Sequence, residues 1–131
     1  MPFIETSMEE PEVKLLPEAE YELRTTSASI KGIKKDNPDG SRKRLNVGLA
    51  STEYPEAETI WWGVNLPHPR SSDQANKMSQ RQLVAFFKLF GIPYEMTGWA
   101  SEDITGHTAR VLVTVGTDQD GAAVNELKFR F

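Results

Sequence analysis

The sequence contains no cysteine and only two histidines. Without cysteine the chain has no disulfide and no thiolate metal ligand, and a reducing cytoplasm is the compartment we expect. No apolar run approaches the roughly 20 residues of a membrane-spanning helix, so we expect no membrane partner. The sequence begins MPFIE, which does not place a basic region before an apolar one, and this predicts that there is no secretory signal.

Common catalytic motifs are also missing. The sequence has no HExxH, GxxxxGK[ST], GxGxxG or GxSxG pattern, each of which arranges ligands, phosphate-binding amides or a nucleophile for a particular reaction. His68 and His107 lack a companion four residues away that would place two metal ligands on one helical face. We therefore predict no enzymatic activity, no catalytic residues, no cofactor and no bound metal.

The 131 residues are enough for one domain with one hydrophobic core. Hydrophobic residues make up 38% of the chain and charged residues 26%, which is typical of a globular protein. The net charge of −4 argues against nucleic acid as a partner, but the charge is unevenly distributed. Residues 1–20 carry a net charge of −5, whereas residues 29–44 carry +4. An acidic leader thus precedes a basic segment.

Alternation of apolar and polar residues predicts five strands, at residues 20–33, 42–51, 58–66, 107–117 and 123–131. Turn-forming residues at 36–41 and 118–121 predict two hairpins, and a bulge is expected within residues 27–29. Residues 71–91 predict one amphipathic helix with an apolar stripe made by Leu83, Phe86, Phe87 and Phe90. Ser79 and Gln82 match a capping box, and Gly91 and Pro93 terminate the helix.

These elements predict a mainly β fold, a five-stranded OB-like barrel (β-β-β-α-β-β) with the helix between strands 3 and 4. The alternative is an open antiparallel sheet with the helix packed on one face. Residues 1–17 are predicted to form an irregular acidic arm and residues 18–131 an OB-like domain that binds single-stranded nucleic acid. The predicted interior consists of Leu45, Val47, Ile60, Trp62, Val111 and Val113.

The basic hairpin and an out-of-phase tryptophan indicate where nucleic acid would bind. Fixed cations bind phosphates, and an exposed ring stacks on any base. Trp61 falls out of phase with Ile60 and Val64, so it either covers another part of the chain or binds a ligand. The predicted nucleic-acid-binding residues are Lys31, Lys34, Lys35, Arg42, Lys43, Arg44, Asn46, Tyr54, Trp61 and Asn65. Trp99 is predicted to anchor a loop.

From residue 15 onward the chain resembles bacteriophage single-stranded-DNA-binding proteins. The resemblance is carried by residues 16–21, the basic hairpin, and residues 61–67, 86–93, 106–111 and 125–128. It implies an OB fold, no catalysis, and a role in DNA replication or recombination in the cytoplasm of the bacterial host, with phage replication proteins as further partners. Many such proteins end in an acidic tail, whereas this sequence ends in residues predicted to form a strand, so the tail is either absent or removed.

Two other functions fit parts of the sequence. The net acidic charge and the N-terminal arm suit a protein-interaction or virion module built on the same barrel. Asp120, Glu126 and Lys128 resemble the acidic pair and E-x-K pattern with which some nucleases hold a metal and polarise a phosphate. Alternation in any polar strand face produces E-x-K, so this pattern is weak support for a nuclease. Sequence-independent binding of single-stranded DNA is the function that the sequence favours.

Overall fold

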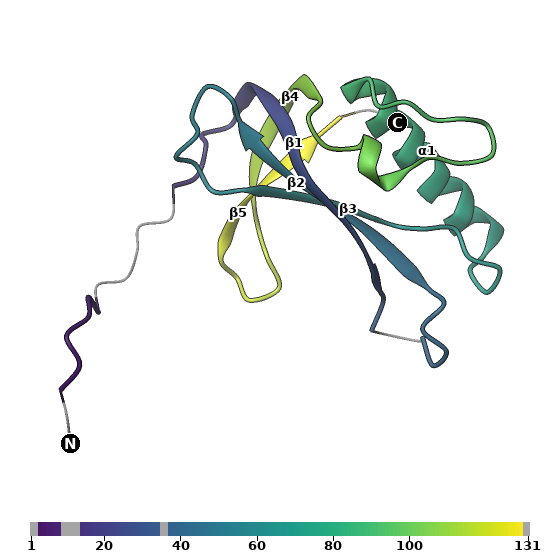
Figure 1. The fold of residues 1–131 in the computed structure, drawn as a ribbon, viewed down its shortest axis with the longest axis horizontal. Helices are drawn as coiled ribbons and strands as arrows, with labels where there is room; N and C mark the ends of the chain where they lie inside the picture. The colour runs from purple at the N-terminus through teal and green to yellow at the C-terminus, as the bar shows by residue number, and fades with distance from the viewer. Residues whose placement is uncertain (1–2, 9–13, 35–36, 130–131) are drawn as a thin grey trace.

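The computed structural model describes residues 3–8, 14–34 and 37–129. Five strands form one antiparallel sheet in the order β3-β2-β1-β4-β5 (Figure 1). The strands are β1 (Ala19–Gly32), β2 (Lys43–Ser51), β3 (Ile60–Asn65), β4 (Thr108–Thr117) and β5 (Ala123–Lys128). The helix α1 (Asp73–Phe90) and a short 3-10 helix, η1 (Ser101–Asp103), connect β3 to β4. The predicted order of strands and helix is confirmed.

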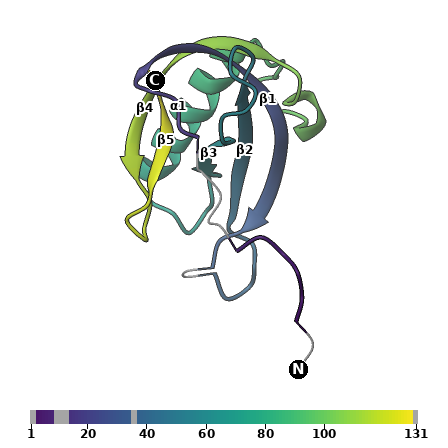
Figure 2. The ribbon, with the colours of Figure 1, turned by 90° about the vertical axis from the view of Figure 1, so that its left-hand side faces the viewer.

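The sheet curves strongly but is not closed. Its two edge strands, β3 and β5, lie side by side with Cα atoms within 8 Å (Figure 2). They do not form a hydrogen-bonded pair in the sheet that the described residues make. The structure is therefore one open, curved antiparallel sheet, with α1 against its concave side.

The hydrophobic core lies between the concave face of the sheet and α1. The predicted helix stripe is confirmed, since Leu83, Phe86, Phe87 and Phe90 are all buried. The predicted interior residues Leu45, Val47, Ile60, Val111 and Val113 are buried as well, and Trp62 is partly buried against them. Phe86 stacks on Trp62 with ring centroids 4.0 Å apart and planes 6° from parallel, which joins α1 to β3.

The helix begins earlier than the capping box predicted. Ser72 is the N-cap, and its side-chain oxygen accepts a hydrogen bond from the Ala75 backbone N–H at 3.1 Å. Ser79 lies in the middle of α1, so the predicted capping role of Ser79 and Gln82 is wrong. A capping box needs an extended backbone at its serine, and here Ser72 adopts it, with φ −64° and ψ 155°. Gly91 ends the helix with φ 66°, as predicted.

Two strands, β3 and β5, are each three residues shorter than predicted, whereas the bounds of the others differ by one residue. Residues 58–59 lie outside β3, because the Glu58 N–H donates to the Lys14 carbonyl at 2.9 Å instead of to a strand. The strand β5 ends at Lys128, and the Phe129 ring packs near Trp62 and Phe86, with centroids 6.1 Å from each. The last residues of the predicted strand, 130–131, lie outside the described residues.

A β-bulge divides β1 into two halves with opposite phase. Thr25 pairs with Leu49 and Ser27 pairs with Gly48, so Thr26 is an extra residue between them. The Thr26 hydroxyl donates to the Gly48 carbonyl at 3.1 Å. The bulge thus lies just before the predicted segment 27–29. Before it, the odd-numbered residues of β1 face the core; after it, the odd-numbered residues face outward.

The N-terminal segment joins the domain at one buried side chain. Leu16 is 4% exposed, and its backbone is held by Asn125, whose side chain accepts from the Leu16 N–H and donates to the Leu16 carbonyl, both at 2.9 Å. Residues 3–8 form neither helix nor strand and run away from the sheet (Figure 1). Phe3, Ile4 and Met8 are exposed. No helix in the described part of the chain combines the length and apolar character needed to cross a bilayer.

Candidate nucleic-acid interface

The convex face of β1, β2 and β3 carries half of the predicted binding residues. Strand register aligns their outward side chains in three rows across the sheet. The rows are Lys31–Arg44–Asn65, Ser29–Asn46–Gly63 and Ser27–Gly48–Trp61. We call these nine residues the convex patch. It contains the predicted residues Lys31, Arg44, Asn46, Trp61 and Asn65, together with Ser27, Ser29, Gly48 and Gly63, which strand register brings to the same face.

Trp61 lies beside a position that has no side chain. A Cβ atom built on Gly48 would come within 3.2 Å of Trp61 Cζ3 and 2.6 Å of Ser27 Oγ, so the tryptophan ring and Ser27 occupy the space above this glycine. The Trp61 residue is 63% exposed. Its predicted outward direction is confirmed, and no described part of the chain covers most of the ring. A large aromatic surface is therefore available to a ligand.

Arg44 lies over the second glycine of the patch. A Cβ atom on Gly63 would come within 2.7 Å of Arg44 Nη2 and 2.8 Å of Asn46 Oδ1. The Arg44 Nη1 group donates to Asn65 Oδ1 at 2.9 Å. Asn65 is neutral, and no carboxylate forms an ion pair with Arg44 among the described residues. The guanidinium is therefore held flat across β3 while its charge stays uncompensated.

The basic hairpin contributes fewer cations to this face than predicted. Lys31 and Arg44 are in register and point outward. Lys43 comes one position before Arg44, so its side chain leaves the opposite face of the strand. Lys34 is exposed in the connecting loop. Lys35 lies outside the described residues.

Arg42 is turned toward the loop before α1. Its Nη2 group donates to Ser71 Oγ at 3.1 Å, and its Nε is buried without a partner among the described residues. Its backbone is bound by the side chain of Asn37, which accepts from the Arg42 N–H at 2.8 Å and donates to the Arg42 carbonyl at 3.0 Å. Arg42 thus shapes the hairpin instead of joining the convex patch.

Tyr54 lies elsewhere on the molecule. It follows the end of β2 that is distant from the hairpin, and its ring meets that of Tyr21 edge to face at 5.8 Å. Together with residues 14–17 it lines a shallow pocket. The structure therefore does not bring Tyr54 beside Trp61. Trp99 packs edge to face on Phe87 at 5.3 Å, which confirms its predicted role as a loop anchor.

Polar side chains clamp the hairpin tip to the loop that follows β3. Asp39 Oδ1 accepts from Arg70 Nη2 at 2.7 Å and from both the backbone and the hydroxyl of Ser41, at 3.1 and 2.7 Å. The Ser41 hydroxyl also lies 2.8 Å from His68 Nε2. Asp39 and Ser41 carry a local turn signal in the sequence, but Arg70 and His68 meet them only in the folded chain. This clamp fixes the hairpin relative to the convex patch.

The hydrogen bonds from Ser41, followed by the charge of Arg70, lower the pKa of Asp39 to about 2. Because this pKa lies below the ordinary value of 3.8, the clamp is expected to be complete above pH 3.8 and to be lost as the pH falls toward 2. A titration of the Asp39 carboxyl carbon by NMR should show the lowered midpoint. Ser41→Ala and Arg70→Gln are each expected to raise the midpoint, and a wild-type midpoint at the ordinary value would contradict this structure of the hairpin tip.

A groove borders Trp61 on the side away from the hairpin. It lies between β3 and the β4–β5 hairpin, with a volume of about 570 Å³. Its lining includes the acidic residues Glu58, Asp118 and Glu126. The convex patch is therefore cationic at its Lys31–Arg44 end and meets an acidic rim beyond Trp61. An anion approaching the patch is favoured at the first end and repelled at the second.

Of the residues of the nuclease hypothesis, Glu126 lines this groove, whereas Asp120 and Lys128 are not part of its lining. The Asp120 N–H donates to Asp118 Oδ1 at 2.9 Å within the β4–β5 turn, while Glu126 and Lys128 belong to β5. Within residues 3–8, 14–34 and 37–129, no three histidine or acidic side chains gather as a set of metal ligands. Neither a protein-family model nor a curated protein matches the chain.

Proposed function

We propose that the protein binds single-stranded DNA without sequence preference, with its convex patch as the binding surface. The observation that carries this proposal is the combination of an uncompensated Arg44 and an exposed Trp61 ring on one sheet face. Cations bind the phosphate backbone, and an aromatic ring stacks on any base. The two residues use different parts of a nucleotide, so together they favour an unpaired strand over a protein ligand.

The spacing of the rows supports this proposal. Arg44 and Gly48 are four residues apart on β2, which is roughly 13 Å at about 3.3 Å per residue. The patch is therefore long enough for a short stretch of extended strand, with phosphates near Arg44 and Lys31 and a base on Trp61. Duplex DNA hides the faces of its bases, so Trp61 adds to the affinity only when the strand is single.

The glycines of the patch also support a flat ligand. Gly48 and Gly63 carry no side chain, so Trp61 and Arg44 lie close to the backbone of β2 and β3. A glycine within a strand often marks a place where another group approaches the backbone. Here the groups that approach are the two that would bind the base and the phosphate.

The architecture suits an OB fold, and we propose that the open sheet is a variant of that barrel. The helix lies between β3 and β4, and the edges β3 and β5 lie side by side. The strand 2–3 face, bordered by the β1–β2 and β4–β5 hairpins, is the surface on which OB folds bind oligonucleotides. With the resemblance to phage proteins, this supports a role in phage DNA replication or recombination in the bacterial cytoplasm.

A titration with labelled oligothymidine tests the function. We expect fluorescence anisotropy to show binding that weakens with salt, together with quenching of tryptophan emission. A duplex of equal length should bind more weakly because its bases are stacked on each other. Absence of binding at low salt would overturn the proposal, and cleavage of the strand in the presence of magnesium would favour a nuclease instead.

Arg44→Gln isolates the interaction with phosphate. For single strands, the slope of the binding constant against salt becomes shallower by about 0.7 for each phosphate that the protein no longer neutralises. We expect that reduction for Arg44→Gln. Arg110→Gln is the matched control, because Arg110 is already close to Glu53, at 3.4 Å, and to Glu20, at 3.9 Å. Equal slopes for the wild type and Arg44→Gln would remove Arg44 from the binding surface.

A further inference from the structure

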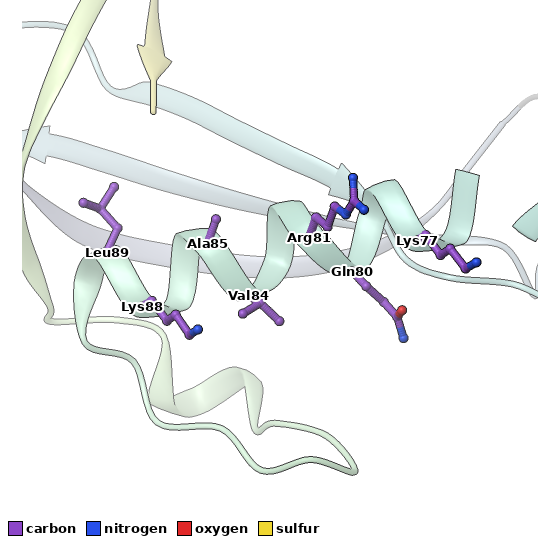
Figure 3. A pocket seen from close by; sticks show the side chains of 7 residues that line it. All are labelled: Lys77, Gln80, Arg81, Val84, Ala85, Lys88 and Leu89. Carbon is purple, nitrogen blue, oxygen red and sulfur yellow. The ribbon is translucent and has the colours of Figure 1, made fainter. Parts of the chain in front are cut away.

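The outer face of α1 forms a second surface, on a different element from the convex patch. Two parallel rows of side chains line a shallow pocket along the helix (Figure 3). One row is Gln80, Val84 and Lys88, the other is Arg81, Ala85 and Leu89, and Lys77 lies at the beginning (Figure 3). The lining thus includes three cations and no carboxylate. None of these cations forms an ion pair within the part of the chain that the structure describes.

An apolar groove adjoins this pocket. Val84 and Gln80 line both, and Val84 is 38% exposed. On its far side the groove is lined mainly by Leu83, Phe87, Tyr94, Met96 and Trp99, with one carboxylate, Glu95. Met96 is completely exposed at the tip of the loop after α1. The whole surface, which we call the α1 groove, therefore offers apolar contacts along one side and positive charge along the other.

The N-terminal segment has the complementary chemistry. Phe3, Ile4 and Met8 are 90%, 78% and 88% exposed, so three large apolar side chains face solvent. Glu5 lies between them, and the sequence continues with Glu9 and Glu10, without a basic residue before Lys14. An apolar and acidic peptide of this kind matches the apolar and cationic sides of the α1 groove.

The path of the chain favours a second molecule as the source of this peptide. Residues 3–8 extend from the side of the sheet opposite α1 (Figure 1). The segment enters the domain at Leu16, which is fixed to β5 by Asn125. Docking on its own helix would require the segment to reverse and cross the molecule, whereas a neighbouring copy needs no such rearrangement.

We propose that the α1 groove binds the N-terminal segment of a second copy of this chain. Phe3, Ile4 and Met8 enter the apolar side beside Val84 and Phe87. Glu5 and the glutamates that follow it face Lys77, Arg81 and Lys88. Because each copy carries both a segment and a groove, the contact is head to tail and extends to chains of molecules unless it closes in a ring. This association is separate from DNA binding and needs no DNA.

Sedimentation velocity on the full chain, over a range of concentrations at low salt and without DNA, tests the proposal. We expect association that weakens with salt. The double variant Arg81→Glu, Lys88→Glu should weaken it about tenfold or more, since like charges then face each other. Glu5→Lys with Glu9→Lys should have the same effect. Combining all four substitutions restores opposite charges and should recover association.

Arg24→Glu with Lys128→Glu is the matched control, because both residues are exposed and the net charge changes equally. This control should associate like the wild type. A labelled peptide of residues 3–12 should bind the full chain and fail to bind the Arg81→Glu, Lys88→Glu variant. The proposal is overturned if the wild type stays monomeric, if the charge swap does not recover association, or if the control weakens it equally.

Discussion

Replacing Trp61 by alanine is expected to weaken binding of oligothymidine by about 1–3 kcal/mol, a factor of roughly 5 to 150. The ring is 63% exposed and lies beside Gly48, so its loss removes a stacking surface without opening the core. Because stacking tolerates any base, the loss should be similar for oligoadenosine and oligothymidine. Anisotropy of a labelled oligonucleotide measures it without relying on tryptophan emission.

Two comparisons test whether the loss of affinity is specific to the Trp61 ring. Tyr54→Ala should leave the affinity nearly unchanged, since Tyr54 packs on Tyr21 away from the convex patch. The Trp61→Ala variant should also keep the salt dependence of the wild type, because Arg44 and Lys31 remain. If Trp61→Ala binds as tightly as the wild type, Trp61 has a structural role and the base-binding part of the proposal fails.

Phe86→Ala is expected to lower the free energy of unfolding by about 3–5 kcal/mol, the range for large aromatic residues removed from cores. Phe86 is fully buried, and its ring lies 4.0 Å from that of Trp62 and 4.7 Å from that of Phe90. Removing it breaks the packing of α1 on β3 and leaves a cavity. Urea denaturation followed by circular dichroism measures the change.

Val84→Ala on the same helix is the control. Val84 faces outward and is 38% exposed, so this substitution should change stability by about 0.5 kcal/mol or less. A loss below about 1 kcal/mol for Phe86→Ala would contradict the packing of α1 on the concave face of the sheet. Small domains have a free energy of unfolding of only about 5–15 kcal/mol. The Phe86→Ala variant is therefore expected to unfold at a much lower urea concentration than the wild type.

Much of the fold follows from period and turn chemistry. Alternating residues such as Leu45, Val47 and Leu49 identify β2 and its buried face, and the phenylalanine spacing identifies α1. These signals are local, because a few neighbouring residues determine each strand face or helix stripe. Closure of the sheet is different, since whether β3 pairs with β5 depends on curvature accumulated over all strands.

The candidate site likewise combines features that are local in the sequence with features that depend on the folded chain. Trp61 is recognisable because it interrupts the phase of its own strand. The support given to Arg44 by Asn65 and Gly63 depends on the register between β2 and β3, which no single segment contains. The same is true of the ion pair between Asp39 and Arg70. Grouping the hairpin cations by proximity in sequence therefore overestimated how many share one face, as Lys43 and Arg42 illustrate.

The bulge at Thr26 constrains how this protein is able to change in length. A deletion of Thr26 would restore simple alternation along β1 and would leave the inward and outward residues of its distal half unchanged, because Ser27 would still pair with Gly48. A deletion of Ser29, beyond the bulge, would instead turn Lys31 to the concave side and Ile30 to the side of Arg44. Insertions of a residue in the loop at 37–41 have no such effect, because the loop lies beyond the paired strands. We therefore expect related sequences to vary in the hairpin tip while keeping the residue count of β1 between the bulge and the hairpin.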